Sequence, residues 1–266
     1  MYGETGMEWL RAKSHFIVAS ALLGLAMTLF LFLPLAVNLF GHAFNISEAL
    51  TDPRTVDAFQ TSFIAATVAT LISMTFGVPL AYLLTQFEFP GRDLIDAMLD
   101  IPILIPHNAA GIALLAVLNP KVLSGASAYG ISFLDSMLGV IAAMVFVSST
   151  FMIRSAQDAF IAVSPDMDKV ARSLGATPGK VFTMVYLPLA SRGLLTGCLL
   201  TWARALSEYG AVVVLAYYPK TVPVHLMDVL VSEGLAVALP INALLILLAI
   251  GVLYTFRRLV TRRSVI

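Results

Sequence analysis

SPDMDKVARSLG, at residues 164–175, interrupts an otherwise apolar chain and predicts a short amphipathic helix. Ser164 is a good helix cap, Pro165 suits the first helical position, and Asp168 places negative charge near the positive end of the helix dipole. Gly175 stands where many helices end in a left-handed residue. The chain is therefore expected to enter and leave this helix sharply.

One face of the predicted helix is apolar. At positions i, i+3, i+4 and i+7 stand Met167, Val170, Ala171 and Leu174, and the opposite face carries Lys169, Arg172 and Ser173. Thr177 and Pro178 then repeat the cap-plus-proline signal and start a second helix in a new direction. The loop 164–179 reads as a docking element, and the alternative is a surface helix without a partner.

The composition places the chain in a membrane. Of its 266 residues, 59% are hydrophobic and 12% are charged, whereas soluble domains carry about 25% charged residues. The formal net charge is zero and no basic cluster is interleaved with aromatic residues, so nucleic-acid binding has no support. The single cysteine, Cys198, excludes an internal disulfide and a cysteine metal cluster.

Apolar stretches recur along the chain, and a hydrocarbon core is crossed by about 20 such residues. They are residues 16–40, 58–87, 94–118, 137–153, 181–217 and 234–256. The predicted fold class is an all-α integral membrane protein, one transmembrane domain over residues 1–266 with six transmembrane helices. The short docking helix lies between spans four and five, and the fifth span is too long to be one straight helix.

The second span has a face of small residues, the pattern that lets membrane helices pack closely. These residues are Ala65, Ala66, Ala69, Ser73, Gly77 and Ala81. In the fourth span, the hydroxyls of Ser148, Ser149 and Thr150 are expected to bond to backbone carbonyls.

The basic residues orient the spans. With an inside N-terminus, the inner segments hold Arg11, Lys13, Arg92, Arg154, Lys169, Arg172, Lys180, Arg192 and four C-terminal arginines, and the outer loops hold Arg54, Lys121 and Lys220. This is the positive-inside bias. We therefore expect a multi-pass protein of the cell membrane with both termini and the docking loop in the cytoplasm.

Two polar features lie inside predicted spans. Pro106 breaks the third span and is followed by His107 and Asn108, which would either form a gate or only cap the break. Arg204 and Glu208 stand one helical turn apart in the fifth span, either as a structural ion pair or as an anion-favouring wall of a translocation pathway. An unpaired arginine at the membrane centre costs at least about 2.5 kcal/mol, which favours the structural pair.

The sequence carries no nucleotide site of its own. Between Gly175 and Gly179 there are three residues, and Val181 follows Lys180, whereas a phosphate-binding loop has four residues between its glycines and Ser or Thr after its Lys. There is no nucleophile elbow, and the four histidines lack metal-ligand spacing. We expect no enzyme activity and no cofactor in this chain, so energy must come from a partner.

Residues 164–188 resemble the cytoplasmic loop of ABC-importer permeases of the type I fold. The family pattern is Glu-Ala-Ala, three residues, Gly, nine residues, an aliphatic residue, any residue, and Leu-Pro. The matches are Gly175, Val185, Leu187 and Pro188, with Ala171 at the second Ala, whereas Lys169 replaces the Glu and Val170 the first Ala. The resemblance implies that the helix fits a cleft on a separate ATPase subunit, which binds ATP and Mg²⁺, and transmits its motion.

Residues 203–211, ARALSEYGA, are similar to the segment that follows this loop in permeases of the molybdate, tungstate and sulfate group. The resemblance implies a homodimer with the pathway between its copies, two ATPase subunits and an extracytoplasmic solute-binding protein. It further implies alternating-access import of an oxyanion, molybdate or tungstate first, with sulfate, thiosulfate or another small anion as the alternative.

Two other classes of function compete with this one. A secondary transporter or channel would show repeated halves and several buried carboxylates or charged rings, but the chain has no convincing repeat and one intramembrane acid, Glu208. A membrane receptor or scaffold would transport nothing, and no segment suggests a signalling domain.

Overall fold

The computed structural model describes residues 4–123, 125 and 129–262, and its regular elements within these ranges are helices. The long helices are α1 (Glu4–His42), α3 (Pro53–Gln86), α8 (Met137–Ile161), α11 (Leu187–Leu206) and α14 (Leu235–Arg262). The shorter ones are η1 (Ala43–Asn45), α2 (Ile46–Thr51), α4 (Arg92–Met98), α5 (Ile101–Leu104), α6 (His107–Leu118), α9 (Pro165–Ser173), α10 (Pro178–Val181), the π-helical turn η2 (Phe182–Tyr186), α12 (Gly210–Leu215) and α13 (Val222–Ser232). The predicted all-α class is confirmed.

Five helical stretches are long and apolar enough to cross a membrane. They are Phe16–Thr51, Pro53–Gln86, Met137–Ile161, Pro178–Leu206 and Leu235–Thr255. A sixth span results if α4, α5 and α6 are taken together as one broken span. These stretches correspond to the predicted spans, and the fifth is interrupted as expected, by η2 near its start and by a break before α12.

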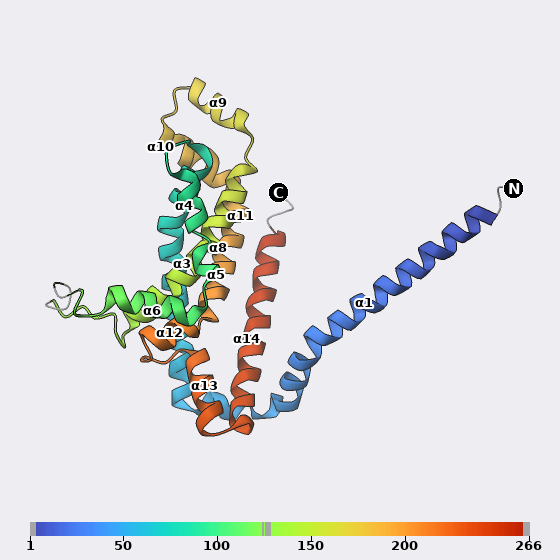
Figure 1. Ribbon diagram of the computed structural model, residues 1–266, viewed down its shortest axis with the longest axis vertical. Helices are drawn as coiled ribbons and strands as arrows, with labels where there is room; N and C mark the ends of the chain where they lie inside the picture. Colours follow the sequence, from blue (N-terminus) through green and yellow to red (C-terminus); the bar gives the residue numbers. More distant parts are fainter. Residues whose placement is uncertain (1–3, 124, 126–128, 263–266) are drawn as a thin grey trace.

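The third span differs from the kinked helix expected over residues 94–118. The segments Arg92–Leu104 and His107–Leu118 meet at 115°, and α6 lies across the bundle (Figure 1). The reason is local: Ile105 is extended (ψ 146°) because it precedes Pro106, whose own ψ of 136° then starts α6 in a new direction. Such a sharp bend exposes backbone groups at membrane depth, which only a protein interior or a wet cavity tolerates.

The centre of the bundle is formed by α3, α8 and α11 (Figure 1). All six small residues of the predicted α3 face are buried: Ala65, Ala66, Ala69, Ser73, Gly77 and Ala81. A Cβ on Gly77 would lie 2.9 Å from the side chain of Ile153 on α8, so the glycine permits the close approach of these helices. Two of the three predicted hydroxyl bonds form, from Ser148 to the carbonyl of Met144 (2.6 Å) and from Thr150 to that of Leu99 (2.8 Å), whereas Ser149 makes none with the described residues.

An aromatic cluster closes the bundle beneath α9. It consists of Tyr82, Phe87, Phe160, Phe182 and Tyr186, whose rings lie 4.8–6.2 Å apart. The Tyr186 hydroxyl donates a hydrogen bond to Gln86 (2.6 Å). Because α3, α8 and η2 all contribute rings, this cluster fixes the base from which the docking loop projects.

The first helix leaves the bundle. In Figure 1, α1 slants away from α14, and none of the residues in its most apolar 18-residue window is buried. Its contact with α14 is near its C-terminal end, where the Asn38 amide donates to the carbonyl of Leu239 (3.5 Å) and accepts from Asn242 (3.4 Å). A single copy of the chain therefore leaves most of an apolar helix without a protein partner.

Candidate functional site: a docking helix and an intramembrane polar cluster

The docking helix α9 is defined by caps at both ends. The Ser164 hydroxyl accepts a long hydrogen bond from the Asp166 N–H (3.4 Å), and Pro165 occupies the first turn. At the other end Gly175 is left-handed (φ +85°), and the N–H groups of Gly175 and Ala176 bond to the carbonyls of Arg172 (2.9 Å) and Ala171 (3.0 Å). This is a Schellman ending, so α9 has the boundaries that the sequence predicted.

Three apolar side chains of α9 face outward. Met167, Val170 and Leu174 are 53%, 56% and 82% exposed. Ala171, predicted as a fourth member of this stripe, is instead half-buried and packs with Ala176 against the aromatic cluster. Ala171 packs α9 against its own bundle, at a place where a small residue fits. Met167, Val170 and Leu174 are left as a three-residue apolar stripe for a partner.

Ion pairs within α9 flank that stripe. Lys169 lies 3.3 Å from Asp166, and Arg172 lies 2.9 Å from Asp168. The hydrogen bond that Arg172 donates to Asp168 raises the pKa of Arg172 above its usual value. Paired charges on the helix itself add little stability in water, but they leave the apolar stripe free of unbalanced charge.

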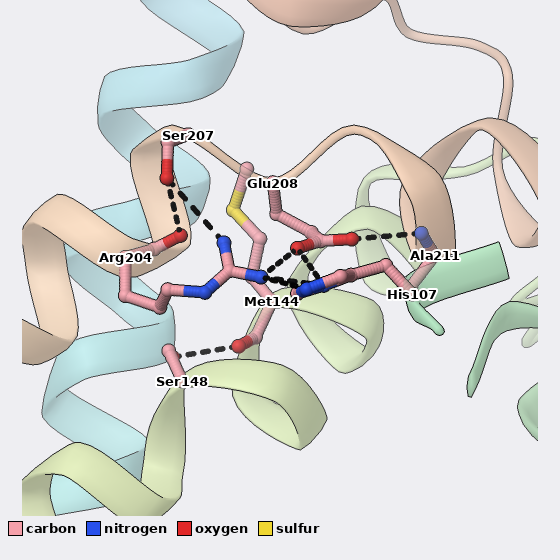
Figure 2. A network of polar contacts seen from close by, with 7 residues as sticks. All are labelled: His107, Met144, Ser148, Arg204, Ser207, Glu208 and Ala211. Atoms are coloured by element: carbon pink, nitrogen blue, oxygen red, sulfur yellow. Dashed lines mark hydrogen bonds and ion pairs between the residues drawn. The ribbon is translucent and has the colours of Figure 1, made fainter. Parts of the chain in front are cut away.

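The intramembrane candidates meet in one polar cluster, shown in Figure 2. Arg204 is in the last turn of α11, Glu208 lies between α11 and α12, and His107 is the first residue of α6. Glu208 Oε2 lies 2.7 Å from Arg204 Nη2 and 3.0 Å from His107 Nδ1. Its other oxygen, Oε1, accepts from the Ala211 N–H at 2.8 Å.

The histidine lies between the acid and the arginine. His107 Nδ1 is 3.0 Å from Glu208 Oε2, and Arg204 Nη2 contacts both ring nitrogens of His107, Nδ1 more closely than Nε2. Glu208 is 1% exposed and both its oxygens are satisfied, whereas the side chains of Arg204 and His107 are 20% and 42% exposed. The acid is thus enclosed, and the two basic groups reach the surface.

Contacts to α3 place the cluster at membrane depth. Trp202, two residues before Arg204, donates its indole N–H to Thr67 (3.2 Å) and stands 5.2 Å from the ring of Phe63. Both partners belong to the charge-free stretch of α3. The cluster therefore lies at the level of the hydrocarbon region.

Glycines let the two broken helices touch. A Cβ on Gly210 would lie 2.5 Å from the Asn108 side-chain oxygen and 2.7 Å from the Cβ of His107. Asn108, a predicted gate candidate, is exposed beside this contact, and Pro106 precedes the first turn of α6. The structure thus brings all five predicted pathway residues, from two segments distant in sequence, to one place.

A second polar cluster was not predicted. Arg154 on α8 binds Asp100 through Nε (2.9 Å) and Nη2 (2.7 Å) and binds Asp96 through Nη1 (2.7 Å), and Gln157 joins Asp96 at 2.7 Å. In the sequence, Asp96 and Asp100 stand four residues apart, and Arg154 and Gln157 stand three apart. These spacings do not reveal that the two pairs meet, because they fit a solvated helix face equally well.

Among the described residues, no group of three or more His, Cys, Asp or Glu side chains could hold a metal ion. Cys198 is half-buried, with its sulfur 3.8 Å from that of Met74, as a packing residue would be.

Comparison with known sequences places these features in a wider group. Residues 73–265 match the family described as binding-protein-dependent transport system inner membrane component. The molybdate/tungstate transport system permease protein of Thermococcus kodakarensis is 37% identical over 255 residues, covering 95% of this chain and 99% of that protein. The sulfate transport system permease protein CysT of Escherichia coli is 34% identical over 171 residues, covering 64% and 62%.

Solved structures show the same fold at low sequence identity. A bacterial alginate ABC transporter, solved in complex with its alginate pentasaccharide-bound periplasmic protein, has a chain that aligns with a TM-score of 0.76 at 14% identity, over 97% of this chain and 98% of that chain. A chain of the MetNI methionine ABC transporter in an inward-facing conformation aligns with a TM-score of 0.64 at 16% identity, over 78% and 94%.

Proposed function

Because the chain belongs to the family of binding-protein-dependent transport system inner membrane components, we propose that it is the membrane permease of an ATP-driven importer of molybdate or tungstate. The substrate class is taken from the names of the relatives, which are 33–37% identical over 86–95% of this chain. Sulfate permeases are similar over a smaller part of the chain.

The observation that carries the proposal is the exposed stripe of α9. An apolar stripe on a short, doubly capped helix that projects from a membrane bundle fits a groove on a partner, as helix-in-groove recognition requires. The partner is an ATPase subunit, which binds the ATP and Mg²⁺ that this chain has no loop to hold. Alternating access then follows when movement of α9 shifts the helices attached to it.

A homodimer is the assembly that the exposed surface supports best. Most of α1 is apolar and uncovered in one copy, and a second copy offers a symmetric way to cover it. Two copies would place a pathway between them, two ATPases on the α9 side and a solute-binding protein on the opposite side. The cytoplasmic position of both termini remains part of the proposal and rests on the positive-inside bias.

Reconstituted transport tests the substrate. The complex of permease, ATPase and binding protein in lipid vesicles should hydrolyse ATP faster with molybdate or tungstate than with sulfate, phosphate or ferric ion. Stimulation by sulfate alone would contradict molybdate or tungstate as the substrate, but the assignment as an ATP-driven importer would stand. A permease that forms no complex with an ATPase would favour a secondary transporter.

Val170→Asp tests the docking stripe. A carboxylate at this exposed position should abolish copurification of the ATPase, because burying an unpaired charge in the interface costs several kcal/mol. Lys169→Glu, on the opposite face of α9, is the matched control and should retain the ATPase. Equal copurification of both variants would contradict docking through this stripe. Because Ala171 packs inward, a substitution there could not separate docking from folding.

A further inference from the structure

We propose that Arg204, with the neighbouring side chain of Ser207, forms an intramembrane binding site for the oxyanion, and that the Glu208 carboxylate pairs with the guanidinium as an internal substitute while the site is empty. This inference rests on the proposed function and adds the place in the pathway at which the tetrahedral dianion is bound. It also assigns the Arg204–Glu208 pair a part in transport, and not in structure alone.

The guanidinium of Arg204 has donors to spare. Its Nη2 serves Glu208 and His107, and its Nη1 makes a long contact of 3.4 Å to the Ser207 hydroxyl. Five N–H donors in a planar fork suit tetrahedral oxyanions as they suit phosphate. Among the described residues Nε has no partner and Nη1 has one long contact, so both remain for a ligand.

Glu208 is held in the way an oxyanion would be held. Its carboxylate accepts one charged donor from Arg204 and one backbone N–H from Ala211, and His107 Nδ1 lies 3.0 Å from it. If Arg204 turns to a ligand, the carboxylate keeps the Ala211 N–H and the contact with His107, so it is not left as an isolated buried acceptor. The exchange of partners is therefore much less costly than breaking an ion pair outright.

Polar side chains in and next to the cluster reach the surface. Ser207 and Asn108 are exposed, and Tyr209, next in the chain to Glu208, is 36% exposed. At membrane depth such groups face a water-filled path or another protein surface, since lipid cannot satisfy them. A cation whose side chain is 20% exposed, beside an acid that is 1% exposed, favours an anion over a cation. Binding should be weak, because a transported ion must also leave.

The test measures equilibrium binding of labelled tungstate to the permease–ATPase complex in lipid nanodiscs without the binding protein. Glu208→Gln removes the internal competitor and should tighten tungstate binding by about ten-fold, equivalent to about 1.4 kcal/mol. The double variant Arg204→Gln/Glu208→Gln balances charge and should bind no tungstate above background. Equal binding by the two variants, at any level, would overturn the proposal, because a purely structural pair gives no reason for Glu208→Gln to bind more tightly.

Ser207 provides a test that does not disturb the buried acid. Ser207→Asp places a carboxylate beside Arg204 on the exposed side and should abolish tungstate binding and lower uptake into vesicles. Normal binding and uptake by Ser207→Asp would overturn the site. If the wild-type complex transports molybdate or tungstate but Ser207→Asp does so equally well, this inference fails and the proposed function stands; if the wild-type complex transports neither, the proposed function fails.

Discussion

At the scale of single residues, the contact between α6 and α12 depends on glycines, because a side chain at these positions would keep the two helices apart. A Cβ on Gly111 would lie 2.8 Å from that of Val214, 2.9 Å from the Ala211 carbonyl oxygen and 3.0 Å from the Ala211 Cα. Backbone atoms cannot rotate away as a long side chain can. Because the Ala211 N–H holds Glu208, any separation here reaches the polar cluster directly.

Gly111→Ala should therefore separate α6 from α12 and destabilise the protein by about 1–3 kcal/mol, the usual cost of overpacking a tight interior. The measurement is thermal unfolding of the purified permease in detergent, with molybdate uptake as a second readout. Gly251→Ala is the control, since a Cβ there meets no atom within 4 Å. Equal unfolding temperatures for the two variants would show that the helices separate freely.

At the scale of helices, the Arg154 cluster joins the docking helix to the broken span. Arg154 and Thr150 lie on α8, which continues through two residues and the Ser164 cap into α9. Their partners Asp96, Leu99 and Asp100 belong to the α4–α5 segment, which leads through Pro106 to His107. A continuous series of packed elements thus runs from the exposed stripe of α9 to the polar cluster.

Arg154→Lys should weaken this connection. A lysine keeps the charge but cannot bridge Asp96 and Asp100 at once, so we expect a loss of about 2 kcal/mol in stability and of most of the stimulation of ATP hydrolysis by oxyanion and binding protein. Basal ATP hydrolysis should remain, because α9 is unchanged. The control is Asp93→Asn, which changes an exposed acid on α4, the helix that carries Asp96. Equal stimulation of ATP hydrolysis in both variants would exclude Arg154 from coupling.

At the scale of the whole molecule, an uncovered helix and an uncovered pocket occur together. The pocket, of about 630 Å³, lies between α3, α11 and α14 and is lined by Phe63, Thr70, Leu195, Cys198, Leu199, Trp202, Leu248, Gly251, Val252 and Thr255. Its lining is almost wholly apolar, as is the exposed part of α1. Lipid can cover both surfaces, but a second copy would cover them with better packing.

A photoreactive benzoylphenylalanine in place of Phe30, which is 74% exposed on α1, should crosslink two copies in native membranes. The expected product is a covalent dimer whose joined peptide includes residues of the pocket. The same label at Phe89, in the turn after α3, is the control and should not join two copies. Labelling of lipid alone from Phe30 would indicate that α1 faces the bilayer on all sides.

Much of this architecture was predictable because it follows from local physics. In lipid every backbone group must bond within its own segment, so apolar length predicts a helical span wherever it occurs. Ser164, Pro165 and Gly175 set the ends of α9 through bonds that reach no more than a few residues along the chain. Charge counts and small-residue spacing likewise need no knowledge of distant partners, and the α3 face was correct for that reason.

Tertiary structure alone decided which of these elements meet. The 115° bend, the approach of His107 to Glu208 across 101 positions, the Arg154 cluster and the inward turn of Ala171 all depend on contacts between distant segments. Inside a membrane, apolar surface is satisfied by lipid as well as by protein, so a hydrophobic pattern specifies a span without specifying its neighbour. The sequence by itself thus determined that this chain is a helical membrane protein with a short capped amphipathic helix between two spans, whereas close packing of small residues determined where its charges gather.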